Sequence, residues 1–416
     1  MKTHVKQPTI LVTIFIILFS ISATAQWVQT SGVTGSNIEC FTVKNSYIYV
    51  GYNDGIDSGG VSRSTNYGID WTNVNTGLPS RKIMALTTSG NNLFTSEYDA
   101  GVYLSTDDGA NWNITGITVE YIYGFATIGT NIFAASTENG VYLSTNNGTS
   151  WNLVNSGLTN VEIRAIYAKG SDLFVGTRGG GVFLSTNNGS SWAAVNAGLT
   201  MKYVYALTSV GSNLFAGTWS AGVFRSTNNG TNWTAANNGL PANQVFALIT
   251  NGSNIFAATY GSGVYLSTNN GDNWSEVNNG LSSLSLRALA VCGSYLYAGG
   301  DISGVWRRPL SEMITDVNDN ENELPIDFIL LQNYPNPFNP STTISFQLPA
   351  SSNVTLKVYD ILGNEIATLV NEHRSVGTYE VEFNTSSINH QTSSGVYFYQ
   401  LKSGDYLETK KMMLLK

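Results

Sequence analysis

The side chains best able to do chemistry in this sequence are arginines, tyrosines, tryptophans and carboxylates, because histidine is nearly absent. Only 3 histidines occur among 416 residues, and the stretch from Trp27 to Arg308 contains none. This stretch therefore cannot form a Ser-His-Asp triad, a Cys-His pair or a histidine-ligated zinc site. Catalysis or binding within it must rely on carboxylate, Tyr, Lys or Arg side chains.

The composition narrows the class of protein further. The net charge is −8, and charged and aromatic residues each make up 12% of the chain. Nucleic-acid-binding proteins need a basic face, and disordered chains are rich in charge and poor in aromatic residues. Neither class fits, and nucleic acid is excluded as a partner. A chain of this length is also too long for one compact core unless it forms a closed array of repeats.

Such a repeat is present and positions the candidate residues. A Gly-Val pair followed by a β-like run recurs every 39 to 41 residues, at Gly60, Gly101, Gly140, Gly181, Gly222, Gly263 and Gly304. Four short β-runs fit within each period, for example 204–208, 213–217, 222–226 and 233–236. Four strands in about 41 residues is typical of a β-propeller blade.

The ends of the repeat predict how the ring closes. The last Gly-Val strand, at 304–308, has no fourth strand after it, whereas Trp27-Val28-Gln29-Thr30 is a fourth strand without the three that should precede it. Pairing the two removes exposed sheet edges. We therefore expect an all-β fold, with a seven-bladed propeller of four-stranded blades over 26–308, closed by the N-terminal strand.

One turn in each repeat resembles the Asp-box, or BNR repeat, whose pattern is Ser-x-Asp-x-Gly-x-Thr-Trp. The third position is Asp107 in one copy and Asn in the other five, but a short polar side chain, a Gly and a Trp can still cap and pack the turn. In families that carry it, the box is structural and lies opposite the binding site. The six copies begin at Ser64, Ser105, Ser144, Ser185, Ser226 and Ser267.

The resemblance therefore places a binding site at the other mouth of the ring, where the repeat varies. Aromatic faces, arginines and carboxylates that converge there suit a polar, flat ligand such as a sugar, although some aromatic side chains could instead fill the channel. At the start of the innermost strands stand Glu39, Met84, Tyr123, Arg164, Tyr205, Phe246 and Arg287, and the loops after the second strands contribute Asn53, Tyr98, Thr137, Arg178, Trp219, Tyr260 and Asp301. From these we predict the ligand-binding residues Tyr98, Arg164, Arg178, Tyr205, Trp219, Tyr260 and Arg287.

A glycoside hydrolase is the alternative. Asp-box propellers include sialidases, which use three arginines and a tyrosine nucleophile, and xyloglucanases, which generally join two propellers. The Arg-Ile-Pro segment of sialidases is absent, and only one propeller is expected. Hydrolysis would need two carboxylates about 5–10 Å apart, and Glu39 and Asp301 are the candidate pair because closure makes their blades neighbours. We favour binding without catalysis, and predict no catalytic residue and no cofactor.

Two further features bear on metals and redox chemistry. The loop 54–59 is acidic and rich in Gly, which suits calcium, but a solvated loop is the simpler interpretation and we predict no metal site. Cys40 and Cys292 fall in repeat columns separated by about 13 Å of strand, whereas the Cα atoms of a disulfide lie within about 7 Å. We therefore predict that Cys40 and Cys292 are free, largely buried thiols.

The N-terminus has the features of an export signal. Lys2 and Lys6 precede an apolar run over 10–21, and Ala23-Thr24-Ala25 is typical of a cleavage site. The apolar run is too short to span about 30 Å of hydrocarbon. We predict a signal peptide over 1–25, no transmembrane segment in the mature chain, and a monomer.

The C-terminal region differs in composition from the repeats. Residues 309–325 form a polar, acidic linker, and alternating apolar runs over 326–416 predict a small Ig-like β-sandwich. Leu331–Ile344 with its Asn-Pro run, the stretch Val358–Gly363, the strand 395–399 and the tail Lys410-Lys411 closely resemble the type IX secretion system type A C-terminal sorting domain. An ordinary Ig-like interaction module is the alternative.

The resemblance to the sorting domain implies where the protein is located in the cell. It implies passage through the periplasm and across the outer membrane of a Bacteroidota-type bacterium, with the type IX machinery as a partner. The expected function is that of a secreted or cell-surface binding protein with a glycan or protein ligand at the loop-rich mouth. The alternative is an extracellular hydrolase, sialidase-like or xyloglucanase-like, at the same rim.

Overall fold

The computed structural model describes residues 26–54, 59–79, 82–118, 121–241, 244–314, 328–385, 393–404 and 406–415. The predicted signal peptide lies outside these residues, as does most of the linker. The chain divides into two compact units, Met1–Thr315 and Asp316–Lys416.

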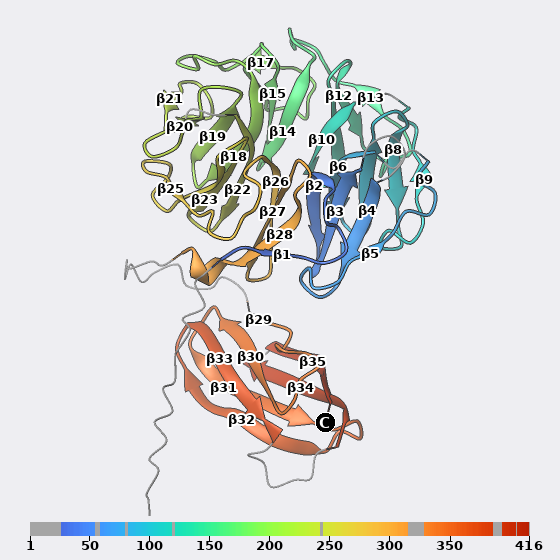
Figure 1. The fold of residues 1–416 in the computed structure, drawn as a ribbon, viewed down its shortest axis with the longest axis vertical. Helices are drawn as coiled ribbons and strands as arrows, with labels where there is room; N and C mark the ends of the chain where they lie inside the picture. Colours follow the sequence, from blue (N-terminus) through green and yellow to red (C-terminus); the bar gives the residue numbers. More distant parts are fainter. Residues whose placement is uncertain are drawn as a thin grey trace, which may run out of the picture. The chain divides into compact units, whose positions relative to one another are not determined.

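The first unit is a ring of seven four-stranded antiparallel sheets, which confirms the predicted seven-bladed propeller (Figure 1). Blades 1 to 3 contain β2 (Asn37–Lys44), β3 (Tyr47–Asn53), β4 (Gly59–Ser64) and β5 (Thr72–Asn73); β6 (Ile83–Ser89), β7 (Asn92–Glu97), β8 (Gly101–Ser105) and β9 (Asn113–Ile114); and β10 (Ile122–Ile128), β11 (Asn131–Ser136), β12 (Gly140–Ser144) and β13 (Asn152–Leu153). Blades 4 to 6 contain β14 (Ile163–Lys169), β15 (Asp172–Thr177), β16 (Val182–Ser185) and β17 (Ala193–Ala194); β18 (Val204–Val210), β19 (Asn213–Thr218), β20 (Val223–Ser226) and β21 (Thr234–Ala235); and β22 (Val245–Asn251), β23 (Asn254–Thr259), β24 (Gly263–Ser267) and β25 (Ser275–Glu276).

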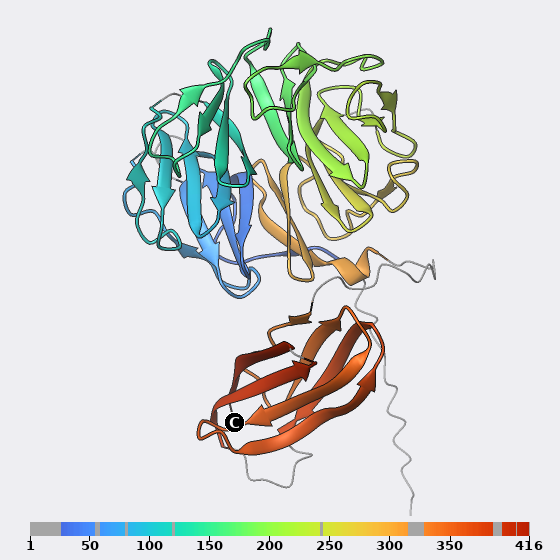
Figure 2. The ribbon, with the colours of Figure 1, turned by 180° about the vertical axis from the view of Figure 1, so that it is seen from behind.

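Blade 7 confirms that the N-terminal strand closes the ring. Its strands β26 (Leu286–Cys292), β27 (Tyr295–Gly300) and β28 (Gly304–Pro309) are completed by β1 (Val28–Gln29), which pairs with β28. Blade 7 lies beside blade 1 in both views (Figures 1 and 2), and Ile38 and Val50 share a core cluster with Ala288 and Tyr297. A short 3₁₀ helix, η1 (Leu310–Glu312), follows β28.

The Asp-box turns bond their own polar groups, which confirms that Asn can replace Asp. In each of the six turns the Ser hydroxyl accepts a hydrogen bond from the Gly amide, at 2.7–2.9 Å, as from Gly148 to Ser144. The third-position oxygen accepts the amide four residues later in every copy, from Asp107 at 2.9 Å and from Asn146 at 2.9 Å. The carboxylate is therefore not required for this turn.

The tryptophans after these turns join neighbouring blades. Trp112 is 3% exposed, and its indole N–H donates to the Val74 carbonyl of the preceding blade at 2.7 Å. Trp27 occupies the same place in the ring, since its indole donates to the Val277 carbonyl at 2.6 Å. The strand that closes the ring is thus anchored by the same contact that Trp112 makes between blades 1 and 2.

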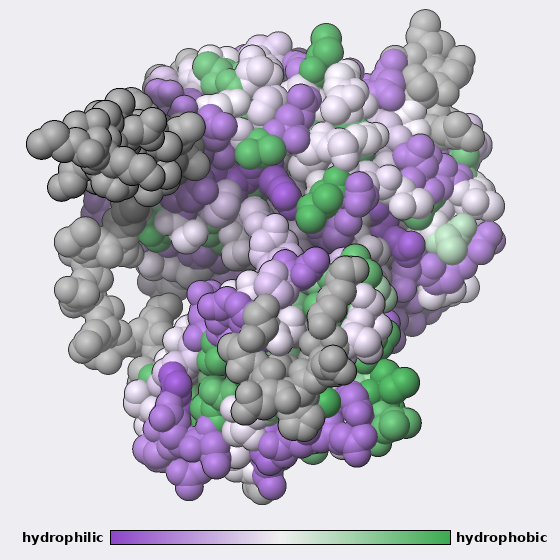
Figure 3. All heavy atoms as spheres, turned by 60° about the horizontal axis from the view of Figure 1, so that its bottom comes forward, coloured by the Kyte–Doolittle hydropathy of each residue, from purple (hydrophilic) through white to green (hydrophobic). Residues whose placement is uncertain are grey.

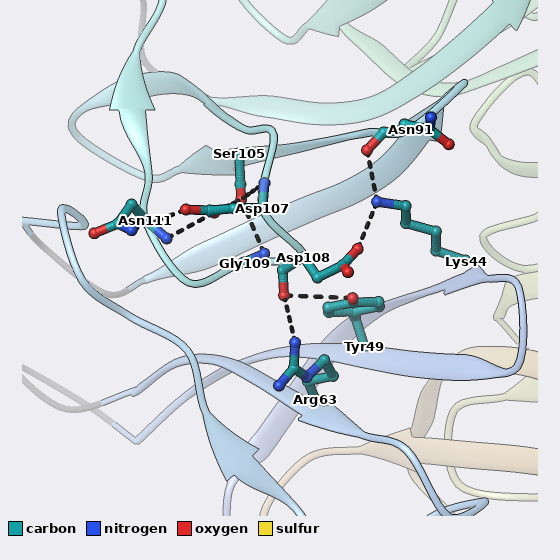
Figure 4. Close-up of polar contacts among 9 residues, drawn as sticks. All are labelled: Lys44, Tyr49, Arg63, Asn91, Ser105, Asp107, Asp108, Gly109 and Asn111. Atoms are coloured by element: carbon teal, nitrogen blue, oxygen red, sulfur yellow. Dashed lines mark hydrogen bonds and ion pairs between the residues drawn. The ribbon is translucent and has the colours of Figure 1, made fainter.

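Cations reinforce the join between blades 1 and 2 at the Asp-box face (Figure 4). Lys44 Nζ donates to the Asn91 carbonyl at 2.6 Å and to Asp108 Oδ1 at 2.5 Å. Arg63 donates to the Asp108 carbonyl at 3.0 Å, as Tyr49 does at 3.4 Å. Three strands of one blade therefore hold one turn of the next (Figure 4).

The second unit is the β-sandwich expected from its alternating apolar runs. One sheet contains β29 (Ile329–Leu330), β30 (Ser341–Leu348) and β33 (Gly377–Asn384), and the other contains β32 (Glu365–Arg374), β31 (Ser352–Tyr359), β34 (Gly395–Ser403) and β35 (Tyr406–Leu414). Alternate residues of β30 are buried, and Phe338, Phe346 and Tyr399 fill the core. On the face of the molecule drawn in Figure 3, hydrophobic residues form small separate groups among hydrophilic ones.

Both cysteines are free, as predicted, although only Cys292 is fully buried and Cys40 is half-buried. Burial raises the pKa of the Cys292 thiol to about 11, which makes it a poor nucleophile. Within the described residues, no helix has the length and hydropathy of a membrane span.

Candidate functional site

A β-bulge lies near the start of every innermost strand of the ring. In blade 1, Ile38 and Cys40 pair with the adjacent residues Tyr52 and Gly51, so that Glu39 is the extra residue. A bulge disrupts the pairing locally and redirects the side chain it carries. The equivalent bulge residues in blades 2 to 7 are Met84, Tyr123, Arg164, Tyr205, Phe246 and Arg287.

Backbone hydrogen bonds fix a second set of side chains above the bulges. The amide of Trp219, which follows the second strand of blade 5, donates to the Tyr203 carbonyl at 3.0 Å. The corresponding amides of Arg178 and Tyr260 donate to carbonyls of their own blades at 2.8 and 2.9 Å. The loop side chains are thus held in register with the bulges.

These two sets surround one pocket of about 850 Å³. All seven predicted ligand-binding residues line it, and so does Glu39; Asp301 is not among the lining residues but binds Arg287. Their lining of one pocket leaves their role in binding a prediction. The lining residues are Glu39, Asn53, Lys82, Met84, Tyr98, Tyr123, Arg164, Arg178, Tyr205, Trp219, Gln244, Phe246, Tyr260 and Arg287.

Aromatic rings form a continuous group on blades 5 and 6. The ring of Tyr205 lies 5.3 Å from that of Trp219 and 5.5 Å, edge to face, from that of Phe246. Phe246 in turn contacts Tyr260 at 5.9 Å. Phe246 is half-buried, whereas Trp219 and Tyr260 are 40% and 41% exposed, so Phe246 supports two rings whose surfaces remain accessible.

On blade 4, Arg164 lies between aromatic rings of the neighbouring blades. Its guanidinium carbon is 4.3 Å from the ring centre of Tyr123 and 5.9 Å from that of Tyr205. Its Nε is buried and has no hydrogen-bond partner among the described residues. Burial raises the pKa of the Tyr205 hydroxyl, although Arg164 and Arg178 act in the opposite direction. A raised pKa is unfavourable for a tyrosine nucleophile.

Carboxylates gather at blades 7 and 1. Asp301 accepts a hydrogen bond from Arg287 Nε at 2.5 Å, and Glu39 accepts one from the Asn53 amide at 2.9 Å. Burial raises the pKa of Glu39, while Arg287 and Asn53 partly offset this effect. The candidate hydrolase pair therefore consists of one ion-paired carboxylate and one half-buried carboxylate with a raised pKa.

Three further lining residues were not among the predicted ligand-binding residues. Tyr123 supports Arg164, Phe246 supports the aromatic group, and Lys82 Nζ lies 5.2 Å from the ring centre of Tyr98. The bulges also went unrecognised. Their signal is a variable residue between a large apolar residue and a small one, as in Ile163-Arg164-Ala165.

Among the described residues, no group of three or more His, Cys, Asp or Glu side chains could hold a metal ion. Most of the acidic loop 54–59 lies outside those residues, so the prediction that it holds no calcium rests on the sequence alone.

Comparison with known proteins supports both units. Residues 332–415 match the family described as secretion system C-terminal sorting domain, and residues 117–255 match the DUF6242 beta propeller domain. A search of curated protein sequences finds no match.

Solved structures similar to this chain share its fold at low sequence identity. YCF48 from Cyanidioschyzon merolae has a TM-score of 0.53 at 14% identity, over 68% of this chain and 98% of that one. PorZ, a surface component of the type IX secretion system of Porphyromonas gingivalis, has a TM-score of 0.51 at 15% identity, over 90% and 59% of the two chains. The GH74 xyloglucanase of Xanthomonas campestris has a TM-score of 0.53 at 14% identity, over 78% and 59%.

These matches agree with the motifs in each unit and with the closed ring of seven sheets. The chain combines a DUF6242-type, BNR-like β-propeller with a type IX secretion C-terminal sorting domain, which directs it through the type IX machinery to the outer-membrane surface or the extracellular space.

Proposed function

We propose that the propeller is a non-catalytic binding module that holds a glycan in the pocket at the mouth of the ring. The observation that carries the proposal is the pair of accessible aromatic faces, Trp219 and Tyr260, inside a concave pocket. Its volume of about 850 Å³ lies within the range of about 300–1,000 Å³ typical of small-ligand pockets. Protein partners usually need about 800 Å² of surface on each side, so a glycan suits this pocket better.

The destination of the chain also supports this proposal. The sorting domain brings the propeller to the outer-membrane surface or the extracellular space, where polysaccharides are accessible. The fold likeness to a xyloglucanase, at 14% identity, carries no activity with it.

A glycan-array screen of the full chain tests binding, with Trp219→Ala and Tyr260→Ala as pocket variants. Each removes an exposed aromatic face, and we expect each to weaken glycan binding at least about tenfold, since aromatic contacts contribute on the order of 1 kcal/mol beyond the area they bury. Tyr334→Ala, which removes a 58% exposed ring from the sorting domain, is the matched control and should bind normally. Unchanged binding by both pocket variants would show that the site lies elsewhere.

Glycoside hydrolysis is a second candidate, favoured by one observation. Burial raises the pKa of Glu39, as a general acid requires, and Asp301 lies close enough to act on Glu39 electrostatically. Against it, Asp301 is ion-paired to Arg287. Hydrolysis assays on the glycans that bind separate the two candidates, because turnover abolished by Glu39→Gln or Asp301→Asn would refute binding without catalysis.

A further inference from the structure

The side chains that line the pocket carry a net positive charge, whereas the whole chain is negatively charged. The chain carries a net charge of −8. The charged residues that line the pocket, however, are Lys82, Arg164, Arg178 and Arg287 against the single carboxylate of Glu39. A concave site lined mainly by one sign of charge raises the local concentration of ligands of the opposite sign.

The charge is divided between two sides of the ring. Arg287 is ion-paired to Asp301 and lies near enough to Glu39 to influence its pKa, so blades 7 and 1 carry one cation beside two carboxylates. Arg164 and Arg178 both belong to blade 4, which lies across the ring from blades 7 and 1 in both views (Figures 1 and 2). The positive side of the pocket is therefore blade 4.

The two arginines of blade 4 have guanidinium groups that are not neutralised by a carboxylate of another described residue. Neither forms an ion pair with another described residue. Arg164 is held by aromatic rings, which attract a cation without neutralising it. Arg178 is exposed at the rim. A guanidinium presents N–H donors in a planar fork that matches a carboxylate.

We propose that blade 4 and blade 5 form a subsite for an acidic sugar, whose carboxylate is held by Arg164 and Arg178 while its ring lies against Tyr205 and Trp219. The inference rests on the proposed function and narrows the glycan to a uronate-containing polysaccharide. Arg164 is 5.9 Å from the Tyr205 ring centre, and Trp219 continues that surface at 5.3 Å. A uronic acid carries its carboxylate directly on a sugar ring, so one residue can contact both features. An aspartate or glutamate side chain has a carboxylate but no ring to cover the aromatic faces.

The test compares oligogalacturonate with the same oligosaccharide fully methyl-esterified, by isothermal titration calorimetry on the full chain. The two differ only at the carboxyl group, which is an anion in the acid and a neutral methyl ester in its partner. We expect the free acid to bind at least about tenfold more tightly than the ester, and its affinity to fall as salt is raised. The variants Arg164→Gln and Arg178→Gln should each remove most of this preference. Arg225→Gln is the control, since it changes the net charge equally on the Asp-box face, where Arg225 pairs with Asp272.

The outcomes separate this inference from the proposed function. Equal binding of acid and ester, with both lost in Trp219→Ala, would overturn the acidic subsite and keep the glycan site. Binding of neither sugar, together with tight binding of poly-glutamate that Arg164→Gln abolishes, would overturn both and indicate an acidic peptide. Near-ultraviolet circular dichroism of each variant checks that the propeller still folds. If Arg164→Gln unfolds, Arg178→Gln decides the question, because Arg178 is exposed.

Discussion

The two faces of the propeller are built on one repeat, but their polar side chains differ in how many of their partners lie within the protein. At the Asp-box face, six turns carry nearly the same side chains, and Ser, Asn or Asp and Gly bond to one another within each turn. At the pocket face, seven bulges carry five residue types, and neither Arg164 nor the exposed Arg178 forms an ion pair with another described residue. The uniform face stabilises the ring, and the varied face has donors available for a ligand.

The largest expected contrast is between two tryptophans, one on each face. Trp112→Ala should cost about 3–5 kcal/mol, because it leaves a cavity between blades and an unpaired Val74 carbonyl. Trp219→Ala should cost about 1 kcal/mol or less, because that ring is 40% exposed. The midpoints of thermal unfolding of the propeller compare the two, and similar losses would contradict the division into structural and binding faces.

Two glycines of positive φ give the next contrast. Gly148 has φ +81° and lies against Phe94, where an added Cβ would be 2.6 Å from a ring carbon. Gly261 has φ +84° but nothing within 4 Å. Gly148→Ala should therefore cost about 2–4 kcal/mol, from backbone strain plus overpacking, and Gly261→Ala about 1 kcal/mol from strain alone. Equal unfolding midpoints for the two variants would mean that Phe94 moves aside freely.

A pair of serines gives a smaller contrast. Ser185 is 1% exposed, and its hydroxyl accepts the Gly189 amide at 2.8 Å and donates to Asn187 at 2.9 Å. Ser185→Ala leaves a buried amide without a partner and should cost about 1–2 kcal/mol. Ser220 is exposed, and Ser220→Ala should change stability by less than about 0.5 kcal/mol. A Ser185→Ala variant as stable as the wild type would show that the Asp-box hydroxyl is dispensable.

The repeat explains why the residues of the variable columns, chosen from the sequence, line one pocket. The Gly-Val pairs and the tryptophans fix the register of each blade, so residues such as Arg164 and Tyr205 fall in one column and meet at one pocket. The closing strand could also be predicted, because Trp27-Val28-Gln29-Thr30 is a fourth strand without the three that should precede it. In the structure Trp27 makes the same contact with the preceding blade as Trp112.

What the sequence could not predict depends on side-chain geometry between blades. The ion pair of Arg287 with Asp301 and the position of Arg164 between two rings involve rotamers that strand periodicity does not determine. The bulges were missed because a period of two describes an unbroken strand, and one extra residue in seven leaves that pattern almost intact.

The smallest effects concern two carboxylates, one on each face, whose pH dependences have opposite signs. Burial raises the pKa of Glu39 above its ordinary value of 4.5, so its contribution to stability is present below that value and is lost as the pH rises through the raised pKa. Hydrogen bonds from Asn111 and Ser105 lower the pKa of Asp107 to about 2, so its contribution is present above its ordinary value of 3.8 and is lost as the pH falls.

Replacing each carboxylate by its amide should therefore change the unfolding midpoint in opposite directions on the two faces. Glu39→Gln keeps the acceptor for Asn53 and should raise the unfolding midpoint at pH 7, with the gain shrinking as the pH falls toward 4.5. Asp107→Asn creates the residue that stands in the other five boxes and should lower the midpoint slightly at pH 7, with the loss shrinking toward pH 2. Unfolding midpoints measured from pH 7 to pH 3 give both slopes. Slopes of the same sign would contradict the comparison, because they would mean that ionised Glu39 is as well accommodated in the pocket as Asp107 is in its turn.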